Sequence, residues 1–216
     1  MSDPDYRWML FVDGENFTIR GQKRAESDGI VIPDGPYSLR DAFLWIPETP
    51  ASQFIWTSEL SPSGGYLPNN HQPRALRSYY YTGVAGDEGR LTGVRNSLRR
   101  LGFDPQVFKK VNQEKHTKAV DISLATELLS LAYKDAYDVV CLIAGDQDYV
   151  PLVKEVKRSG KQVYISFFTG GSDAGLSEAL RLEADLFLDL TGLFDVRRRS
   201  LHERNQAAKG KVAKSS

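Results

Sequence analysis

Residues 138–151 read DVVCLIAGDQDYVP and join a long apolar run to a pair of carboxylates. The six residues from Val139 to Ala144 are apolar on both faces, a pattern typical of a strand buried in a parallel sheet. Gly145 allows the backbone to turn sharply as it leaves this strand. The pattern therefore places the carboxylates at the carboxyl end of a central strand, where open α/β sheets bind ligands.

The two carboxylates are Asp146 and Asp148, and Pro151 suits the first turn of a helix that follows them. Carboxylates this close repel each other unless a cation lies between them. Mg2+ is the usual hard cation in such a place because it prefers oxygen ligands. The alternative is that both are ordinary loop residues, with Asp148 as the N-cap of the helix. This segment alone leaves both interpretations open.

A second stretch, near the start of the chain, has the same design. The apolar run Trp8–Val12 ends in the polar sequence Asp13-Gly14-Glu15-Asn16. If the two strands are neighbours in a parallel sheet, they lie about 4.8 Å apart. Asp13 and Asp146 can then share one ion.

The rest of the chain alternates strands and helices, which indicates an α/β fold with a mainly parallel central sheet. Runs of apolar, aromatic and β-branched residues predict strands at 77–82, 105–111, 161–168 and 186–190. Apolar residues at helical spacing predict helices at 17–25, 91–101, 118–132, 150–159 and 174–184.

Residues 28–76 interrupt this alternation, because they are rich in Pro, Gly and Ser and also carry aromatic residues. Within them, 43–46 and 54–57 are predicted as two strands of a loose hairpin. A structureless loop of this length is unusual in a compact domain, so we expect an ordered excursion or a mobile lid. The aromatic side chains fit a local core or a homodimer contact better than a surface on which RNA bases stack.

A third carboxylate, Asp121, falls in the first turn of the helix predicted at 118–132. The helix dipole favours an anion there, which is one explanation for its position. The other explanation is that the helix begins at the carboxyl edge of the sheet and aims Asp121 into the same cleft. Lys118, one turn earlier, could then touch a phosphate or the carboxylates.

Basic residues cluster locally, although the formal net charge of the 216-residue chain is zero. One cluster surrounds the loop before this helix, and another begins at Arg197, where the sequence also loses apolar residues. The second cluster predicts a disordered tail that could bind polyanions. Any contact with nucleic acid must therefore be local, since net charge provides no overall attraction.

The single cysteine, Cys141, lies in the apolar run and cannot form an internal disulfide. No apolar run reaches the roughly 18 residues of a membrane span, and the start of the chain lacks the pattern of a signal peptide. We therefore expect a cytoplasmic protein with no membrane partner.

Three motifs together resemble the NYN domain family, the PIN-like group that includes the LabA-like proteins. They are FVDGEN at 11–16, KAVDI at 118–122 with Leu124 and Ala125, and AGDQDYVPLV at 144–153. The resemblance covers residues 8–190 except 28–76, and it implies a three-layer α/β/α sandwich. We accordingly expect one domain over 1–196, with 28–76 as an insertion and 197–216 as the tail.

The resemblance also implies a ribonuclease that depends on Mg2+ or Mn2+. It assigns the catalytic metal cluster to Asp13, Asp121, Asp146 and Asp148, with Asn16 and Lys118 in support. Many relatives carry a further Asp on the helix that follows, and the matching residue here is Glu127, a longer carboxylate that can still reach the site. The resemblance implies RNA as the substrate. Because a cleft at strand ends is narrow, we expect a single strand or a structured loop, with its backbone held by the basic tail and by Lys109, Lys110, Lys115 and Lys118.

Two other functions fit the same pattern. One is a module that binds RNA or protein and keeps the acidic cleft but turns over poorly. The other is a different Mg2+-dependent phosphoryl-transfer enzyme, of the Toprim or haloacid-dehalogenase type. A phosphatase of the haloacid-dehalogenase type would need Asp-x-Asp after the first strand, where this chain has Asp13-Gly14-Glu15. Strand order separates these classes, because PIN-like sheets place the Asp13 strand beside the Asp146 strand.

Overall fold

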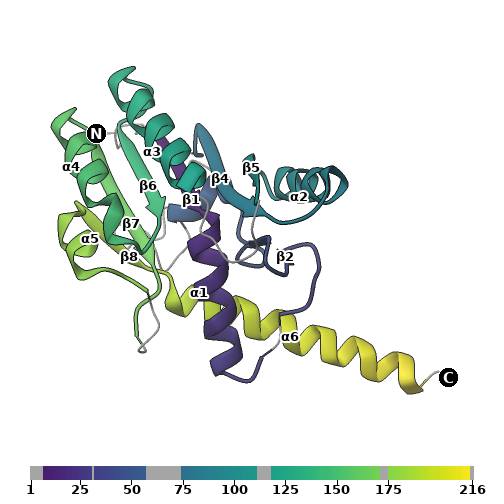
Figure 1. Cartoon of the computed structure of the whole chain (residues 1–216). Helices are drawn as coiled ribbons and strands as arrows, with labels where there is room; N and C mark the ends of the chain where they lie inside the picture. Colours follow the sequence, from purple (N-terminus) through teal and green to yellow (C-terminus); the bar gives the residue numbers. More distant parts are fainter. Residues whose placement is uncertain (1–6, 31, 57–73, 111–117, 171–174, 215–216) are drawn as a thin grey trace.

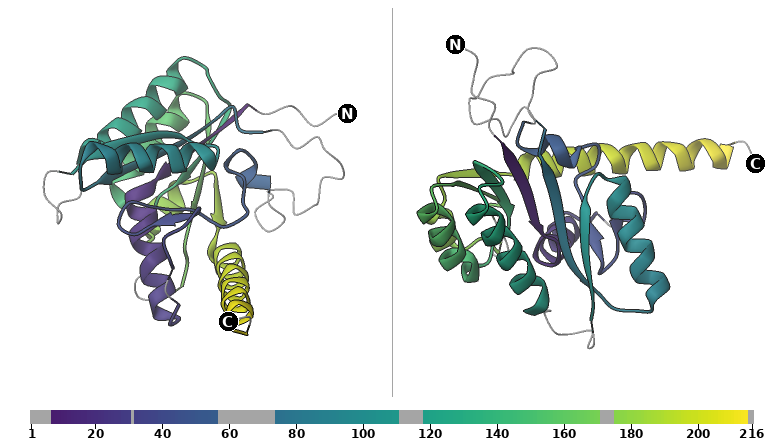
Figure 2. Two further views of the ribbon diagram at one scale, coloured as in Figure 1. Left: turned by 90° about the vertical axis from the view of Figure 1, so that its right-hand side faces the viewer. Right: turned by 90° about the horizontal axis from the view of Figure 1, so that it is seen from above.

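The computed structural model describes residues 7–30, 32–56, 74–110, 118–170 and 175–214. Within these residues a six-stranded parallel sheet is covered by helices on both faces (Figures 1 and 2). The predicted α/β class with a mainly parallel central sheet is confirmed.

The strand order is β5-β4-β1-β6-β7-β8, and every neighbouring pair is parallel. The strands are β1 (Trp8–Asp13), β4 (Arg77–Val84), β5 (Asp104–Lys109), β6 (Val139–Ile143), β7 (Gln162–Phe167) and β8 (Leu186–Asp189). The chain builds outward from β1 through β4 and β5, and then on the other side from β6 through β7 and β8. The side of the sheet to which the chain adds strands therefore changes between β1 and β6. Open α/β sheets bind ligands at such switch points. The predicted pairing of these two strands is confirmed.

The helices form a layer on each face of the sheet. One layer contains α1 (Gly14–Ser27), α2 (Glu88–Arg100) and α6 (Thr191–Lys214), whose apolar side chains share one core cluster. The other contains α3 (Lys118–Tyr133), α4 (Val150–Arg158) and α5 (Glu178–Glu183), which share a second cluster. The three layers are seen edge-on in the right-hand view of Figure 2.

Side chains of β1 alternate between the two layers. Leu10 and Val12 belong to the cluster beneath α1 and α2, whereas Met9 and Phe11 belong to the cluster beneath α3 and α4. Because this alternation has a period of two, Asp13 at the end of β1 continues the second row. Its carboxylate is therefore aimed at the α3 layer.

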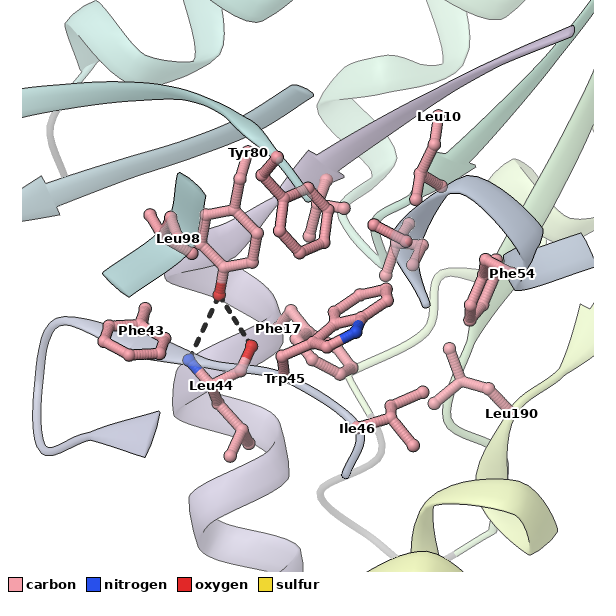
Figure 3. Close-up of a cluster of buried hydrophobic side chains, with 14 of the residues drawn as sticks. Leu10, Phe17, Phe43, Leu44, Trp45, Ile46, Phe54, Tyr80, Leu98 and Leu190 are labelled. Atoms are coloured by element: carbon pink, nitrogen blue, oxygen red, sulfur yellow. Dashed lines mark hydrogen bonds between the residues drawn. The ribbon is translucent and has the colours of Figure 1, made fainter. Parts of the chain in front are cut away.

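The described part of the 28–76 segment is ordered, and the hairpin predicted there is wrong. β3 (Phe43–Leu44) pairs instead with β2 (Ser38–Leu39), and residues of the second predicted strand belong to a 3-10 helix, η1 (Ala51–Trp56). The prediction of a local core is confirmed for Phe43, Trp45 and Phe54, which are buried against the α1 layer (Figure 3). The aromatic residue Tyr66 lies outside the described residues.

The C-terminal segment is helical, so the predicted disordered tail at 197–216 is wrong as far as Lys214. α6 begins at Thr191, directly after β8, and extends beyond the body of the domain (Figure 1). Its first turns are anchored by buried Leu193, Phe194 and Arg198. Arg197 and Arg204 form ion pairs with Glu48 of the inserted segment.

Among the helices of the described residues, none combines the length and the apolar character that a membrane crossing requires.

The hydroxyl of Tyr80 joins the inserted segment to the core (Figure 3). It donates to the carbonyl of Leu44 at 2.8 Å, and it also lies 3.2 Å from the backbone N of Leu44 and 3.2 Å from Oγ1 of Thr18. Tyr80→Phe leaves these buried groups short of a partner. We expect the free energy of unfolding, measured by urea denaturation, to fall by about 1–3 kcal/mol.

Tyr133→Phe is the matched control, because the Tyr133 hydroxyl bonds Glu155 at the surface. We expect this variant to stay within about 0.5 kcal/mol of the unaltered protein. Equal losses in the two variants would contradict the role given to Tyr80.

Candidate functional site

Asp13 ends β1 and starts α1. Its Oδ1 accepts a hydrogen bond from the backbone N–H of Asn16 at 3.1 Å, which makes it the N-cap of the helix. The residue is only 1% exposed. The sequence folds this way because an aspartate is a preferred N-cap and the apolar run before it is drawn into the sheet.

The side chain of Tyr149 brings Asp13 and Asp121 together. Its hydroxyl oxygen lies 3.0 Å from Oδ2 of Asp13 and 3.2 Å from Oδ1 of Asp121. A phenol carries one proton, so the two carboxylates lie within reach of the same donor. Burial, and then the negative charges of Asp13 and Asp121, raise the pKa of Tyr149 far above its ordinary value. The phenol therefore keeps its proton at neutral pH.

Asp121 lies in the first turn of α3, as predicted, and the start of that helix points it toward Asp13. The interpretation that this turn reaches the ends of the strands therefore agrees with the geometry. Tyr149 was not singled out from the sequence. The sequence feature that pointed to Tyr149 was its position directly after Asp148 and before the helix α4, where the side chain is buried.

Asp148 lies in a short 3-10 helix, η2 (Gln147–Tyr149), between β6 and α4, and Asp146 directly precedes this helix. Asp146 caps it, since its Oδ1 accepts from the backbone N–H of Asp148 at 3.1 Å. The prediction that Asp148 caps the following helix is wrong, because α4 begins at Val150 after Tyr149, with no side-chain cap. Asp148 is exposed, and Asp146 is partly buried.

The four predicted metal ligands are not gathered into one preformed cluster. In the described part of the chain, no three His, Cys, Asp or Glu residues lie close enough together to hold a metal ion. The structure joins Asp13 and Asp121 through Tyr149, and it places Asp146 and Asp148 after the neighbouring strand. Around the switch point, Asp13 and Asp121 therefore form a pair, and Asp146 and Asp148 are separate from it.

Gly145 has a packing role in addition to its place at the end of β6. A Cβ atom there would lie 2.3 Å from the carbonyl oxygen of Gly175, which is closer than Cβ atoms in proteins approach non-bonded atoms. The carbonyl of Gly145 also accepts a hydrogen bond from the N–H of Ser177 at 2.7 Å. The segment at 175–177 is therefore held against the turn that carries Asp146.

Glu15 and Asn16 add oxygen atoms beside Asp13, in the first turn of α1. Glu15 is 5% exposed, and its Oε1 forms an ion pair with Lys110 at the end of β5. Its Oε2, and Oδ1 of Asn16, are buried acceptors without a hydrogen-bond partner among the described residues. The ion pair argues against the predicted role of Lys110 in holding RNA, because that ammonium is already engaged and largely buried.

The remaining predicted residues lie around this centre or outside it. Lys109 and Lys118 are exposed, whereas Lys115 falls outside the described residues. Glu127 accepts a hydrogen bond from the hydroxyl of Tyr81 at 2.7 Å, farther along α3. Burial, followed by this carboxylate, raises the pKa of Tyr81. The carboxylate of Glu127 is thus hydrogen-bonded to a buried phenol.

The sequence profile of the NYN domain matches residues 7–191, which is most of the chain. The chain belongs to the NYN domain family. The expected resemblance is therefore confirmed, and with it membership of the PIN-like superfamily. NYN domains are generally nucleases and typically use divalent metals.

One curated relative and one solved structure that resemble this chain have no assigned activity. An uncharacterized protein of Methanocaldococcus jannaschii is 24% identical over 127 residues, which is 57% of this chain and 51% of that protein. The chain thus spans about half the length of this curated relative. The crystal structure of a protein of unknown function from Vibrio parahaemolyticus matches with a TM-score of 0.54 and 16% identity. That match covers 90% of this chain and 99% of the other.

The Lys110–Glu15 pair is open to a direct stability test. Lys110→Met keeps most of the aliphatic volume and leaves a buried carboxylate without its cation. Breaking such a pair on one side costs about 3–5 kcal/mol, and we expect a loss of that size in urea denaturation at neutral pH. Lys109→Met, at the exposed neighbouring position, is the control that should change little. A small loss in both variants would show that Lys110 is a surface residue in solution.

The raised pKa of Tyr149 predicts the shape of alkaline unfolding. An unfolded tyrosine ionises near pH 10, whereas the folded phenol resists ionisation, so this stability is present below about pH 10 and lost above it. Tyr149→Phe lacks this loss. We therefore expect the unfolding free energies of the two proteins to converge by about 1.4 kcal/mol per pH unit above pH 10. Parallel curves in urea denaturation would contradict a buried, protonated Tyr149.

Proposed function

We propose that this NYN domain is a metal-dependent ribonuclease that hydrolyses phosphodiester bonds at the carboxyl ends of β1 and β6. The observation that supports this most directly is the contact of Asp13 and Asp121 with one phenol oxygen. Two carboxylates lie there at the switch point of the sheet, in a family whose members are generally nucleases.

The residues around this point fit a hard divalent cation in their chemistry. All of the candidate ligands are carboxylate or amide oxygens, which Mg2+ and Mn2+ prefer. Oδ1 of Asn16 is also a buried acceptor that lacks a partner in the described structure. Asp13 and Asp121 would hold the ion, with Asn16, Asp146 and Asp148 nearby in the chain turns that surround them.

A bound Mg2+ or Mn2+ ion would lower the pKa of a water molecule bound to it. The positive charge of the ion would also offset the negative charge of the scissile phosphate. The protein groups supply orientation. Tyr149 holds its proton between Oδ2 of Asp13 and Oδ1 of Asp121, and it thereby fixes the two carboxylates relative to each other. The N-terminus of α1 fixes Oδ1 of Asp13 from the other side. This arrangement requires no serine or histidine nucleophile.

Exposed lysines near the site would hold the RNA backbone. Lys109 ends β5 and Lys118 begins α3, so both lie at the carboxyl edge of the sheet. Phosphate contacts of this kind make binding sensitive to salt. The choice of RNA over DNA rests on the family resemblance, and the choice of a single strand rests on the narrowness expected of a cleft at strand ends.

The second candidate is a binding module of the same fold with weak or absent catalysis. One observation favours it, namely that no three acidic or imidazole side chains of the described residues are assembled for a metal. Tyr149 already provides a proton donor to both carboxylates without an ion. RNA binding without cleavage is the outcome that this candidate requires.

The test is cleavage of end-labelled single-stranded RNA and DNA by the pure protein in Mg2+, Mn2+ or EDTA. We expect RNA cleavage that depends on the metal and disappears in Asp13→Asn and Asp121→Asn. Tyr149→Phe should reduce the rate by about 10–100-fold, the loss typical of residues that orient metal ligands.

Asp104→Asn is the matched control, because Asp104 is an exposed carboxylate at the opposite end of a strand. It should cleave at the rate of the unaltered protein. Cleavage that survives Asp13→Asn would come from a contaminant. Salt-dependent RNA binding without cleavage in any metal would replace the nuclease with the binding module.

A further inference from the structure

A cavity of about 280 Å³ lies between the inserted segment and α6. Its wall includes Leu44, Trp45 and Phe194, which belong to the core cluster beneath α1 and α2. The cavity is therefore on the opposite face of the sheet from the Asp13 and Asp121 carboxylates. Its volume is close to the lower end of the range for small-molecule sites, about 300–1,000 Å³.

Most of the wall is apolar, but Arg198 also lines it. This residue is only 4% exposed, and its guanidinium lies 5.5 Å from the ring centre of Phe194. Nη2 donates to Asp28 at 2.6 Å and to Asp195 at 3.1 Å. Nε and Nη1 have no hydrogen-bond partner within the described ranges of the chain.

The positive charge of Arg198 is balanced by nearby aspartates, but some of its N–H groups lack a hydrogen-bond acceptor. Asp195 also binds Arg24, through two hydrogen bonds of 2.9 and 2.5 Å. Two arginines thus face two aspartates, Asp28 and Asp195. What remains is one N–H on Nε and two on Nη1, all in a buried wall, and buried donors without acceptors are unfavourable.

The surroundings restrict the charge of a suitable ligand. Two further ionisable side chains, the carboxylate of Asp34 and the imidazole of His202, line the wall, and the arginine–aspartate network beside them is neutral. A dianionic phosphate would meet this extra negative charge, whereas a carboxylate brings two acceptor oxygens and one charge. The prolines and aliphatic side chains around it suit an apolar body.

We propose that this cavity binds a small monocarboxylate with a compact apolar body, whose carboxylate accepts a hydrogen bond from Nη1 of Arg198. The apolar body lies against Trp45, Leu44 and the prolines of the inserted segment. Since the cavity is on the other face of the sheet, its occupation is independent of the nuclease proposal.

The experiment is titration calorimetry of the full chain with phenylacetate and with phenylacetamide, which share an aromatic body and differ in charge. We expect saturable binding of phenylacetate at millimolar concentration or below. The amide should bind at least about tenfold more weakly, because a charged acceptor forms the stronger bond with a guanidinium.

Two variants test the location. Asn205 is an exposed residue of the wall on α6, and Asn205→Trp would fill the mouth of the cavity. Gln206→Trp, at the next exposed position outside the wall, is the matched control. We expect binding to be lost in the first variant and kept in the second. Arg198→Lys keeps a positive charge toward Asp28 and Asp195 but removes the guanidinium donors, and it should weaken phenylacetate by at least about tenfold.

Circular dichroism and thermal unfolding check that each variant is folded. If Arg198→Lys does not fold, Asn205→Trp still tests the location of the site. Three results would overturn the proposal. They are no saturable binding of phenylacetate, equal binding of acid and amide, and unchanged affinity in Asn205→Trp. Each would mean that water satisfies Arg198 in a cavity without a ligand.

Discussion

The parallel pairing of β1 with β6 is the constraint on which the other features depend. Both strands have neighbours on each side and helices on each face, so all of their residues are buried. A carboxylate at the end of β1 is consequently drawn inward and needs hydrogen-bond donors. The N-terminus of α1 supplies one, and the hydroxyl of Tyr149 supplies another. The first helix and the turn after β6 therefore take their positions partly from the solvation of Asp13.

Much of the fold was predictable because buried faces of strands and helices require apolar residues at regular spacings in the sequence. The run Val139–Ala144 and its counterpart at Trp8–Val12 predicted the central strands, and the helical spacing of apolar residues at 118–132 predicted Asp121 in the first turn of a helix. The contacts between these residues were not predictable. Tyr149 meets Asp13 across 136 positions of the chain, so only the packed structure can bring that phenol to that carboxylate.

The errors have the same physical origin. A charged segment and a Pro-rich segment each look weakly structured alone, yet they stabilise each other through contacts distant in sequence. Arg198 reaches Asp28 across 170 positions, and its guanidinium is buried although its neighbours in sequence are basic. Likewise Lys110 resembled a lysine free to bind RNA, but it neutralises Glu15. Charge patterns report composition, and they do not distinguish an exposed cation from one whose partner lies on a distant element.

The union of α6 with the inserted segment also defines the smallest fragment that can be expected to fold faithfully. A chain cut after residue 196, where the basic composition begins, would lose the partners of Asp28 and Glu48. It would also remove the α6 residues beyond Phe194 that cover Trp45 and the prolines beside it. A large apolar surface would then face water, and the shortened protein would be prone to aggregate. Fragments made for biophysical work should therefore extend at least to Arg204.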